Sequence, residues 1–206
     1  MTPSTTTRWW WIRHAPVINP DGKIYGQSDM DADLTNNDQF KLLADLLPED
    51  AVWVTTTLQR AGKTARKLAS TSPLDPTIAE DDNLREQAFG DWEGARWSEI
   101  PAADSDPYWK DPVKTRMPNG ESFHDVLTRV AATVERLNCD HSGRNVIAVA
   151  HAGSIRAAIG HALGGDARAA LSFHLSPLSL TRIDAIDRDG QIWWRVAGVN
   201  LYGNHA

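Results

Sequence analysis

Two apolar runs in this 206-residue chain each end at a histidine. Residues 9–12 lead through Arg13 to His14, and residues 146–150 lead directly to His151. An uninterrupted apolar run is typical of a strand that is buried on both faces of a parallel sheet. In open α/β sheets, ligands bind beyond the carboxyl ends of such strands. The two runs therefore predict that both imidazoles face one binding site.

The residues next to the two histidines favour an anionic ligand. Arg13 places a permanent positive charge beside His14. Gly153 and Ser154 follow His151 where a helix is expected to begin, and helix N-termini bind anions. Phosphate is the anion that we expect there.

Strand-like and helical patterns alternate along most of the chain. This alternation predicts an α/β fold of three layers, α/β/α, around a mostly parallel central sheet. Ser122 is the expected N-cap of one helix, and Pro48 is expected to end another. We expect helices at 38–47, 60–69, 122–137 and 155–163. Besides the two strands that end at histidines, we expect strands at 52–55, 178–183 and 192–199, the last two as candidates for antiparallel pairing.

One stretch, at about 95–120, breaks this alternation. It carries four prolines among aromatic residues, which predicts an irregular, lid-like excursion with room for one short helix. Residues 83–91 are also expected to be irregular. The length and the 41% hydrophobic content are sufficient for one core, so we expect a single domain over residues 1–206.

Composition and charge narrow the possible partners. The formal net charge of −6 argues against a nucleic-acid partner bound through a broad basic surface. We find no signal peptide and no apolar stretch of membrane-spanning length, so we expect a cytoplasmic protein with no membrane partner. The single Cys139 excludes an intramolecular disulfide and is interpreted as a packed or inert thiol near a helix end. Monomer and homodimer both remain open.

Five short sequence blocks along the chain contain the candidate catalytic residues and can be compared as one set of motifs. They are Arg13-His14-Ala15, Thr56 to Ala61 with Thr64 and Ala65, Leu84 to Glu86 with Phe89 to Gly94, Asn119 to Ser122, and His151-Ala152-Gly153. Together they resemble the motifs of the histidine phosphatase superfamily, and they span most of the chain. The resemblance implies a phosphoglycerate mutase-like fold and a small phosphatase that acts without metal or cofactor.

The resemblance also implies catalytic roles. His14 would attack phosphorus and form a phosphohistidine, which water then hydrolyses. Arg13 and Arg60 would bind the phosphoryl oxygens, and His151 would donate to them as their charge grows. Glu86 would act as the general acid and then as the general base. The expected activity is hydrolysis of a small phosphorylated metabolite, with α-ribazole phosphatase-like enzymes as a narrower possibility by analogy.

Other assignments stay open. Asp91, Glu93 or Glu121 could supply the proton instead of Glu86. Asn19, Gly26 and Gln27 are candidate substrate-binding residues, although loop conformation alone explains Asn and Gly at these positions. The alternatives to a phosphatase are a phosphoglycerate mutase-type phosphotransferase and a non-catalytic phosphate-binding module. The brevity of the excursion favours hydrolysis, because a mutase must exclude water from its phosphoenzyme.

Several residues have a purely structural interpretation. Each histidine or arginine of the motifs, taken alone, is more often a structural or solvated residue, and it is their combination that favours catalysis. Trp9 to Trp11 alternate across a strand, so core packing on both faces is expected. The aromatic residues Trp92, Trp97, Tyr108 and Trp109 would either contact substrate or pack the excursion against the core. The remaining histidines, His124, His141, His161, His174 and His205, show no metal-binding spacing.

The chain departs from the family pattern at three points. Ala15 and Ala152 replace glycines, which is tolerable where the backbone needs no positive φ. Thr56 and Thr57 stand in for Ser-Pro, which keeps the first hydroxyl and loses the constraint of the proline ring.

Overall fold

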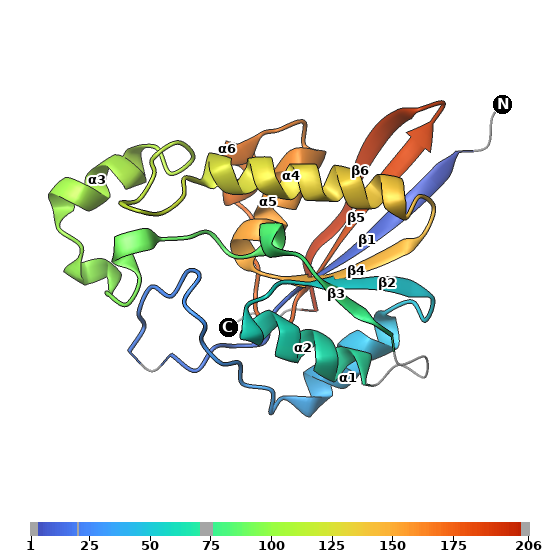
Figure 1. Ribbon diagram of the computed structural model, residues 1–206, viewed down its shortest axis with the longest axis horizontal. Coiled ribbons are helices and arrows are strands. Elements are labelled where there is room, and N and C mark those ends of the chain that lie inside the picture. Colours follow the sequence, from blue (N-terminus) through green and yellow to red (C-terminus); the bar gives the residue numbers. More distant parts are fainter. Residues whose placement is uncertain (1–3, 20, 71–75, 203–206) are drawn as a thin grey trace.

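The computed structural model describes residues 4–19, 21–70 and 76–202. Within these residues, six strands form one mixed sheet in the order β3-β2-β4-β1-β5-β6 (Figure 1). The first four strands along the chain are mutually parallel: β1 (Thr5–Arg13), β2 (Ala51–Thr55), β3 (Ile78–Glu80) and β4 (Asn145–Ala150). β5 (Leu180–Arg188) and β6 (Gln191–Leu201) close the sheet with antiparallel pairing. The mostly parallel sheet and its antiparallel end are thus confirmed.

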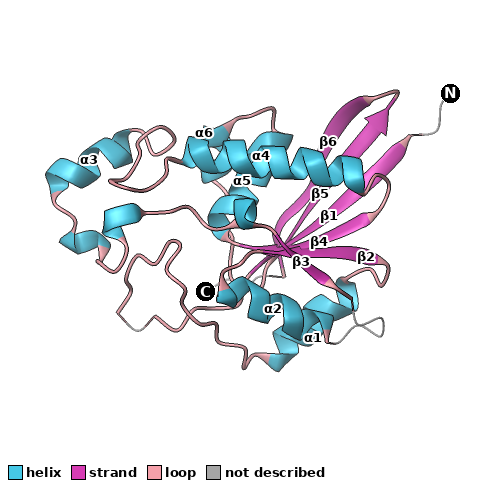
Figure 2. Cartoon of the chain, viewed as in Figure 1, coloured by secondary structure: helices cyan, strands magenta, loops and turns pink. Residues whose placement is uncertain are grey.

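Helices cover both faces of this sheet, which confirms the three-layer architecture (Figure 2). One face packs under α1 (Asn37–Leu46) and α2 (Gln59–Ala69). The other packs under α4 (Phe123–Asp140) and α5 (Ala152–Ala162), beside the short α6 (Ala167–Leu171). Each layer buries its own apolar cluster against the sheet, because both faces of the central strands are apolar.

The tryptophans of β1 divide between these two clusters, as the alternation of a strand requires. Trp9 and Trp11 stack with their ring centroids 5.0 Å apart in the cluster under α4 and α5. Trp10 packs against the opposite cluster. The expectation of core packing on both faces is confirmed.

The register between β1 and β4 positions the two histidines. Arg13 is paired with Ala150, so His14 and His151 are the next residues of two adjacent parallel strands. Parallel strands leave the sheet at the same edge, which places both imidazoles on one side of the molecule. β2 pairs with β4 on its other side and ends at Thr55, next to Thr56.

The helices begin and end close to the expected residues. Ser122 caps α4, with its hydroxyl accepting from the backbone N–H of Asp125, and Asp125 in turn accepts from the backbone N–H of Ser122. α4 continues to Asp140, and α5 begins directly after His151, at Ala152. β3 and α6 were not predicted from the sequence, because both are too short to show a regular apolar spacing.

The expected excursion contains one short α-helix, α3 (Ala102–Lys110), which includes Pro107. Three 3₁₀ turns lie nearby: η1 (Asp82–Leu84), η2 (Gly90–Trp92) and η3 (Trp97–Glu99). The aromatic residues of this region pack on one another. Their ring contacts link Phe89, Trp92, Trp97, Tyr108 and Trp109. Trp92 is buried, whereas Trp109 remains 62% exposed. In the part of the chain that the structure describes, every helix is too short or too polar to cross a membrane.

Candidate active site

His14 is fully buried and holds one defined tautomer. Its Nδ1 lies 2.7 Å from the carbonyl oxygen of Ala15. A carbonyl only accepts, so Nδ1 carries the proton and Nε2 has the free lone pair. That Nε2 atom is buried and has no hydrogen-bond partner within the described residues. Burial above all, and then the charges of Arg13 and Arg60, hold the pKa of His14 well below its ordinary value.

His151 is equally buried but has a partner for each ring nitrogen. Arg60 donates from Nε to its Nδ1 at 3.3 Å, and its Nε2 lies 2.9 Å from the hydroxyl of Thr56. An arginine only donates, so Nε2 carries the proton and donates to Thr56. Burial, followed by His14 and Arg60, lowers the pKa of His151 well below its ordinary value. The centroids of the two rings are 5.1 Å apart. The lowered pKa values favour the neutral form of both imidazoles.

Two guanidinium groups flank these rings. Arg60 is fully buried on α2, and it donates to the carbonyl oxygens of Ser28 at 2.8 Å and of Gly26 at 2.6 Å. Arg13 donates from Nη1 to Leu175, while its buried Nε has no partner within the described residues. Arg13, His14, Arg60 and His151 therefore come together as the sequence predicted, with two buried nitrogen atoms unpartnered.

Thr64, for which sequence analysis assigned no role, fixes the backbone after His14. Its hydroxyl accepts from the backbone N–H of Ala15 at 3.0 Å and donates to the carbonyl of Arg60 at 2.7 Å. Neither Ala15 nor Ala152 is among the described residues with positive φ, so alanine in place of glycine strains neither position. The sequence feature that could have predicted this role is the position of Thr64 one helical turn after Arg60.

Glu86 reaches the site from the segment after η1. Its Oε1 accepts from the backbone N–H of Gly153, in the first turn of α5, and from Gln87, both at 2.9 Å. A Cβ on Gly153 would overlap this oxygen, so only glycine admits the carboxylate here. No hydrogen bond between described residues engages Oε2. The retained glycine of the His-x-Gly block thus explains how Glu86 approaches the end of β4.

The three competing acids are engaged elsewhere. Asp91 accepts twice from the amide of Asn119. Glu121 forms an ion pair with Arg129 at 2.8 Å. Glu93 accepts from the backbone N–H groups of residues 27, 28 and 89 and from the hydroxyl of Ser28. These bonds leave Glu86 as the acid with an oxygen available, which favours its assignment as the proton donor.

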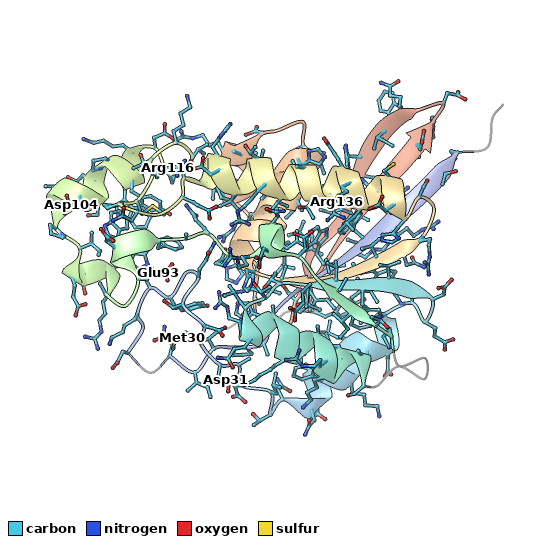
Figure 3. All side chains as sticks on the ribbon, viewed as in Figure 1. Met30, Asp31, Glu93, Asp104, Arg116 and Arg136 are labelled. Carbon is cyan, nitrogen blue, oxygen red and sulfur yellow. The ribbon has the colours of Figure 1, made fainter. Side chains whose placement is uncertain are left out.

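The loop after β1 carries the predicted substrate-binding residues, and it reaches the site only in part. Gly26 supplies a carbonyl to Arg60, and Gln27 donates from its amide to the carbonyl of Glu86 at 2.8 Å. Asn19 instead bonds with Lys23 in its own turn. Figure 3 shows Glu93 on the segment that faces this loop, which carries Met30 and Asp31. Substrate contact by Asn19, Gly26 and Gln27 stays a prediction.

Arg156, on the second turn of α5, was not predicted from the sequence. Its Nε donates to the carbonyl of Phe173 at 2.9 Å. Burial lowers its pKa, the charge of Glu86 opposes this shift, and Arg13 adds to it. Burial also raises the pKa of Tyr108, and the charge of Arg156 opposes that shift. Arg156 thus belongs to the electrostatic environment of Arg13, Glu86 and Tyr108, although none of the five motif blocks contains it.

Other candidate groups lie apart from this site. A cavity of about 440 Å³ is lined by residues such as Glu135, His161 and Trp194 and by none of the catalytic candidates. Over residues 4–19, 21–70 and 76–202, no three His, Cys, Asp or Glu side chains are grouped to hold a metal. Cys139 lies near the end of α4 as expected, but it is exposed, so the packed alternative is wrong and the inert thiol stays a prediction. His205 lies outside the described residues.

The family follows from comparison with known proteins. A sequence profile of the histidine phosphatase superfamily (branch 1) matches residues 9–197, which include His14, His151, Arg13, Arg60 and most of the sheet. The chain belongs to this superfamily.

Its relatives include phosphatases. Over 165 residues the chain is 31% identical to a glucosyl-3-phosphoglycerate phosphatase of Mycolicibacterium vanbaalenii, covering 74% of this chain and 72% of that protein. The structure resembles that of a putative alpha-ribazole-5′-P phosphatase from Escherichia coli K-12, with a TM-score of 0.80 and 25% identity over 97% of this chain and 98% of the other. A bifunctional protein of Mycobacterium tuberculosis is 36% identical over 135 residues, 64% of this chain. The chain spans about a third of that relative, since the match covers 36% of it.

Proposed function

We propose that this chain hydrolyses small phosphate monoesters through a phosphohistidine at Nε2 of His14. One observation carries the proposal: a buried imidazole with a fixed tautomer presents an unpartnered lone pair beside two guanidinium groups. A structural histidine at this depth would have a partner for each nitrogen, as His151 does.

In the first step, the lone pair of Nε2 forms a bond to phosphorus while the bond from phosphorus to the ester oxygen breaks. Arg13 and Arg60 bind the equatorial oxygens, because guanidinium forks match a phosphoryl group. Glu86, in its protonated form, gives its proton to the departing oxygen. The products of this step are an alcohol and a phosphohistidine.

In the second step, water attacks phosphorus and the bond to Nε2 breaks. Glu86, now a carboxylate, takes a proton from that water, and inorganic phosphate leaves. His151 would stabilise both transition states if its Nε2–H exchanged Thr56 for a phosphoryl oxygen. Besides the substrate and the attacking water, each of these proposed transfers involves a side chain of the chain.

Hydrolysis is favoured over transfer between two positions of one substrate. A mutase has to exclude water from its phosphoenzyme. The excursion here contributes one nine-residue helix, α3, and its Trp97 and Trp109 remain exposed. The substrate is a small phosphorylated metabolite, and the relatives named above offer two types: a glucosylated phosphoglycerate and an α-ribazole phosphate.

The proposal is tested by trapping the intermediate. We expect rapid quench with a ³²P-labelled aryl phosphate, in the presence of a chelator, to give an acid-labile phosphoenzyme that decays to inorganic phosphate. His14→Asn should give neither label nor turnover. His124→Asn, at an exposed histidine of α4, is the matched control and should behave as wild type. Turnover without label, or label that passes mainly to a second position of 3-phosphoglycerate, would reject the proposed reaction. Binding without turnover in the wild type would indicate a phosphate-binding module.

The role of Glu86 is tested by leaving-group dependence. Glu86→Gln keeps the size of the side chain and removes the proton donor. We expect kcat for alkyl phosphates to fall about 10²- to 10⁴-fold, and kcat for activated aryl phosphates to fall far less, because a good leaving group needs no proton. Glu121→Gln is the control among the competing acids. Equal losses on both ester types would assign the proton to another group.

A further inference from the structure

We propose that Arg156 binds a carboxylate of the substrate, next to the phosphoryl group held by Arg13 and Arg60. The inference rests on the proposed function, and it makes the preferred substrate a phosphate ester of a hydroxy acid or amino acid.

The first observation is where α5 directs Arg156. Gly153 faces the carboxylate of Glu86, and Arg156 lies three residues further along the same helix. Residues three apart share a helix face, so Arg156 lies on the side of α5 that faces Glu86. The same face thus carries a position that admits the proposed acid and, one turn later, a guanidinium group.

The second observation is how the two guanidinium groups are anchored. Arg156 donates from Nε to the carbonyl of Phe173, and Arg13 donates from Nη1 to the carbonyl of Leu175, two residues further on. One segment, residues 173–175, therefore holds both cations close together. Like charges repel, and a pair held by backbone carbonyls is favourable when an anion lies between or beside them.

The third observation is that the Nη atoms of Arg156 are left without protein partners among the described residues. Within the described residues, no hydrogen bond or ion pair engages its Nη atoms, which contrasts with Arg60, whose Nη atoms both bind carbonyls. Glu86 is the one carboxylate whose charge raises the pKa of Arg156, yet no ion pair joins the two side chains within the described residues. Arg156 therefore has no directly paired carboxylate until a substrate supplies one.

The geometry of the ligand decides its chemical class. In the proposed reaction the phosphoryl group binds at His14 and Arg13. Arg156 is anchored next to Arg13, so the anionic group that Arg156 binds would be close to the ester oxygen of the substrate. A carboxylate accepts two parallel bonds from one guanidinium and carries the single charge that one arginine neutralises. The charge of Arg156 opposes the burial-raised pKa of Tyr108, so this α3 residue shares the electrostatic environment of Arg156, and its hydroxyl is a second potential donor.

The experiment compares phosphate esters with and without a carboxylate. Phosphoserine and phosphoethanolamine differ by a carboxylate in place of hydrogen, and 3-phosphoglycerate and glycerol 3-phosphate differ by a carboxylate in place of a hydroxymethyl group. We expect the wild type to prefer the carboxylate member by about 10- to 100-fold in kcat/KM, the range of one charge-assisted hydrogen bond. Arg156→Gln should bring the preference close to one, mainly by raising KM. Arg156→Lys should retain part of it. Arg168→Gln, at an exposed arginine of α6, is the control and should retain all of it.

Two results would overturn the inference. The first is a wild type that does not distinguish the members of each pair. The second is an Arg156→Gln variant that loses activity equally on both members, which would mean that Arg156 acts only through Glu86 or the fold. The same four ligands are titrated by calorimetry into the wild type in phosphate-free buffer and into His14→Asn. These affinities report the carboxylate preference even if no ester is turned over, so failure of the inference and failure of the proposed hydrolysis are separate results.

Discussion

The ends of β1 and β4 are built alike and hold their histidines differently. Each apolar strand ends at a buried imidazole, and burial is the largest cause that lowers the pKa of both. At the end of β1, a backbone carbonyl holds the proton on Nδ1 and leaves Nε2 of His14 unpartnered within the described residues. At the end of β4, Arg60 and Thr56 occupy both nitrogens of His151. The same sequence pattern therefore produces a free lone pair in one place and a held proton in the other.

This difference separates the roles of two residues that look equivalent in the sequence. A nucleophile needs an unprotonated nitrogen that points into the site, and a transition-state donor needs an N–H of fixed orientation. The partners decide which role is possible, because a carbonyl forces one tautomer and an arginine forces the other.

The largest effect should therefore come from His14. We expect His14→Asn to lower kcat/KM at least about 10⁴-fold, because His14 is the group that we propose to form the covalent intermediate. Steady-state kinetics on an aryl phosphate measures the loss, and thermal unfolding checks that the fold persists. A residual activity within about 100-fold of wild type would mean that the two strand ends do not have distinct roles.

His151→Asn should have a smaller effect of another kind. The loss expected for one donor to the transition state is about 10²- to 10³-fold in kcat, and the phosphoenzyme should still form. Rapid-quench labelling distinguishes this result from loss of the nucleophile. If His151→Asn abolished labelling while His14→Asn did not, the assignments of the two histidines would have to be exchanged.

Thr64→Val tests whether the Thr64 hydroxyl holds the backbone that follows β1. The substitution leaves the buried N–H of Ala15 without its acceptor, so we expect the free energy of unfolding to fall by about 1–3 kcal/mol. Thr64→Ser keeps the hydroxyl and should recover most of this loss. Denaturant titration gives both values. Equal stability of the valine and serine variants would show that the hydroxyl does not hold this turn.

The smallest effect is a dependence of stability on pH. His14 and His151 have lowered pKa values when folded, whereas in the unfolded chain they titrate near 6.5. As pH falls below 6.5, the unfolded state takes up protons that the folded state does not, so stability is complete above this pH and declines below it. We expect the free energy of unfolding at pH 6.0 to be about 1–2 kcal/mol lower than at pH 7. His14→Asn should reduce this decline, and an unchanged decline would mean that protonation of His14 is not its cause.

How much the sequence predicted depends on the range of the signal. The apolar runs and the helical spacing were sufficient to predict the layers of the fold and the proximity of His14 and His151, because neighbouring parallel strands end at the same edge of the sheet. The motif blocks added Arg60, which lies on α2. Arg156 was missed, since its relevance arises from contacts with the segment at 173–175 and from the position of Glu86. Both depend on tertiary packing. The tautomers could not be predicted either, because they are set by a neighbouring carbonyl and, for His151, by an arginine on a different element of the fold.

Glu93 influences the proposed phosphate site indirectly, through the backbone of the loop after β1. Its carboxylate gathers the backbone of residues 27 and 28, and the carbonyls of Gly26 and Ser28 in turn orient Arg60. Glu93 therefore helps to orient the buried guanidinium group of Arg60, although no hydrogen bond joins the two side chains within the described residues. Substitution of Glu93 is therefore a way to change the affinity of the proposed site for phosphate while Arg13, Arg60 and both histidines stay intact.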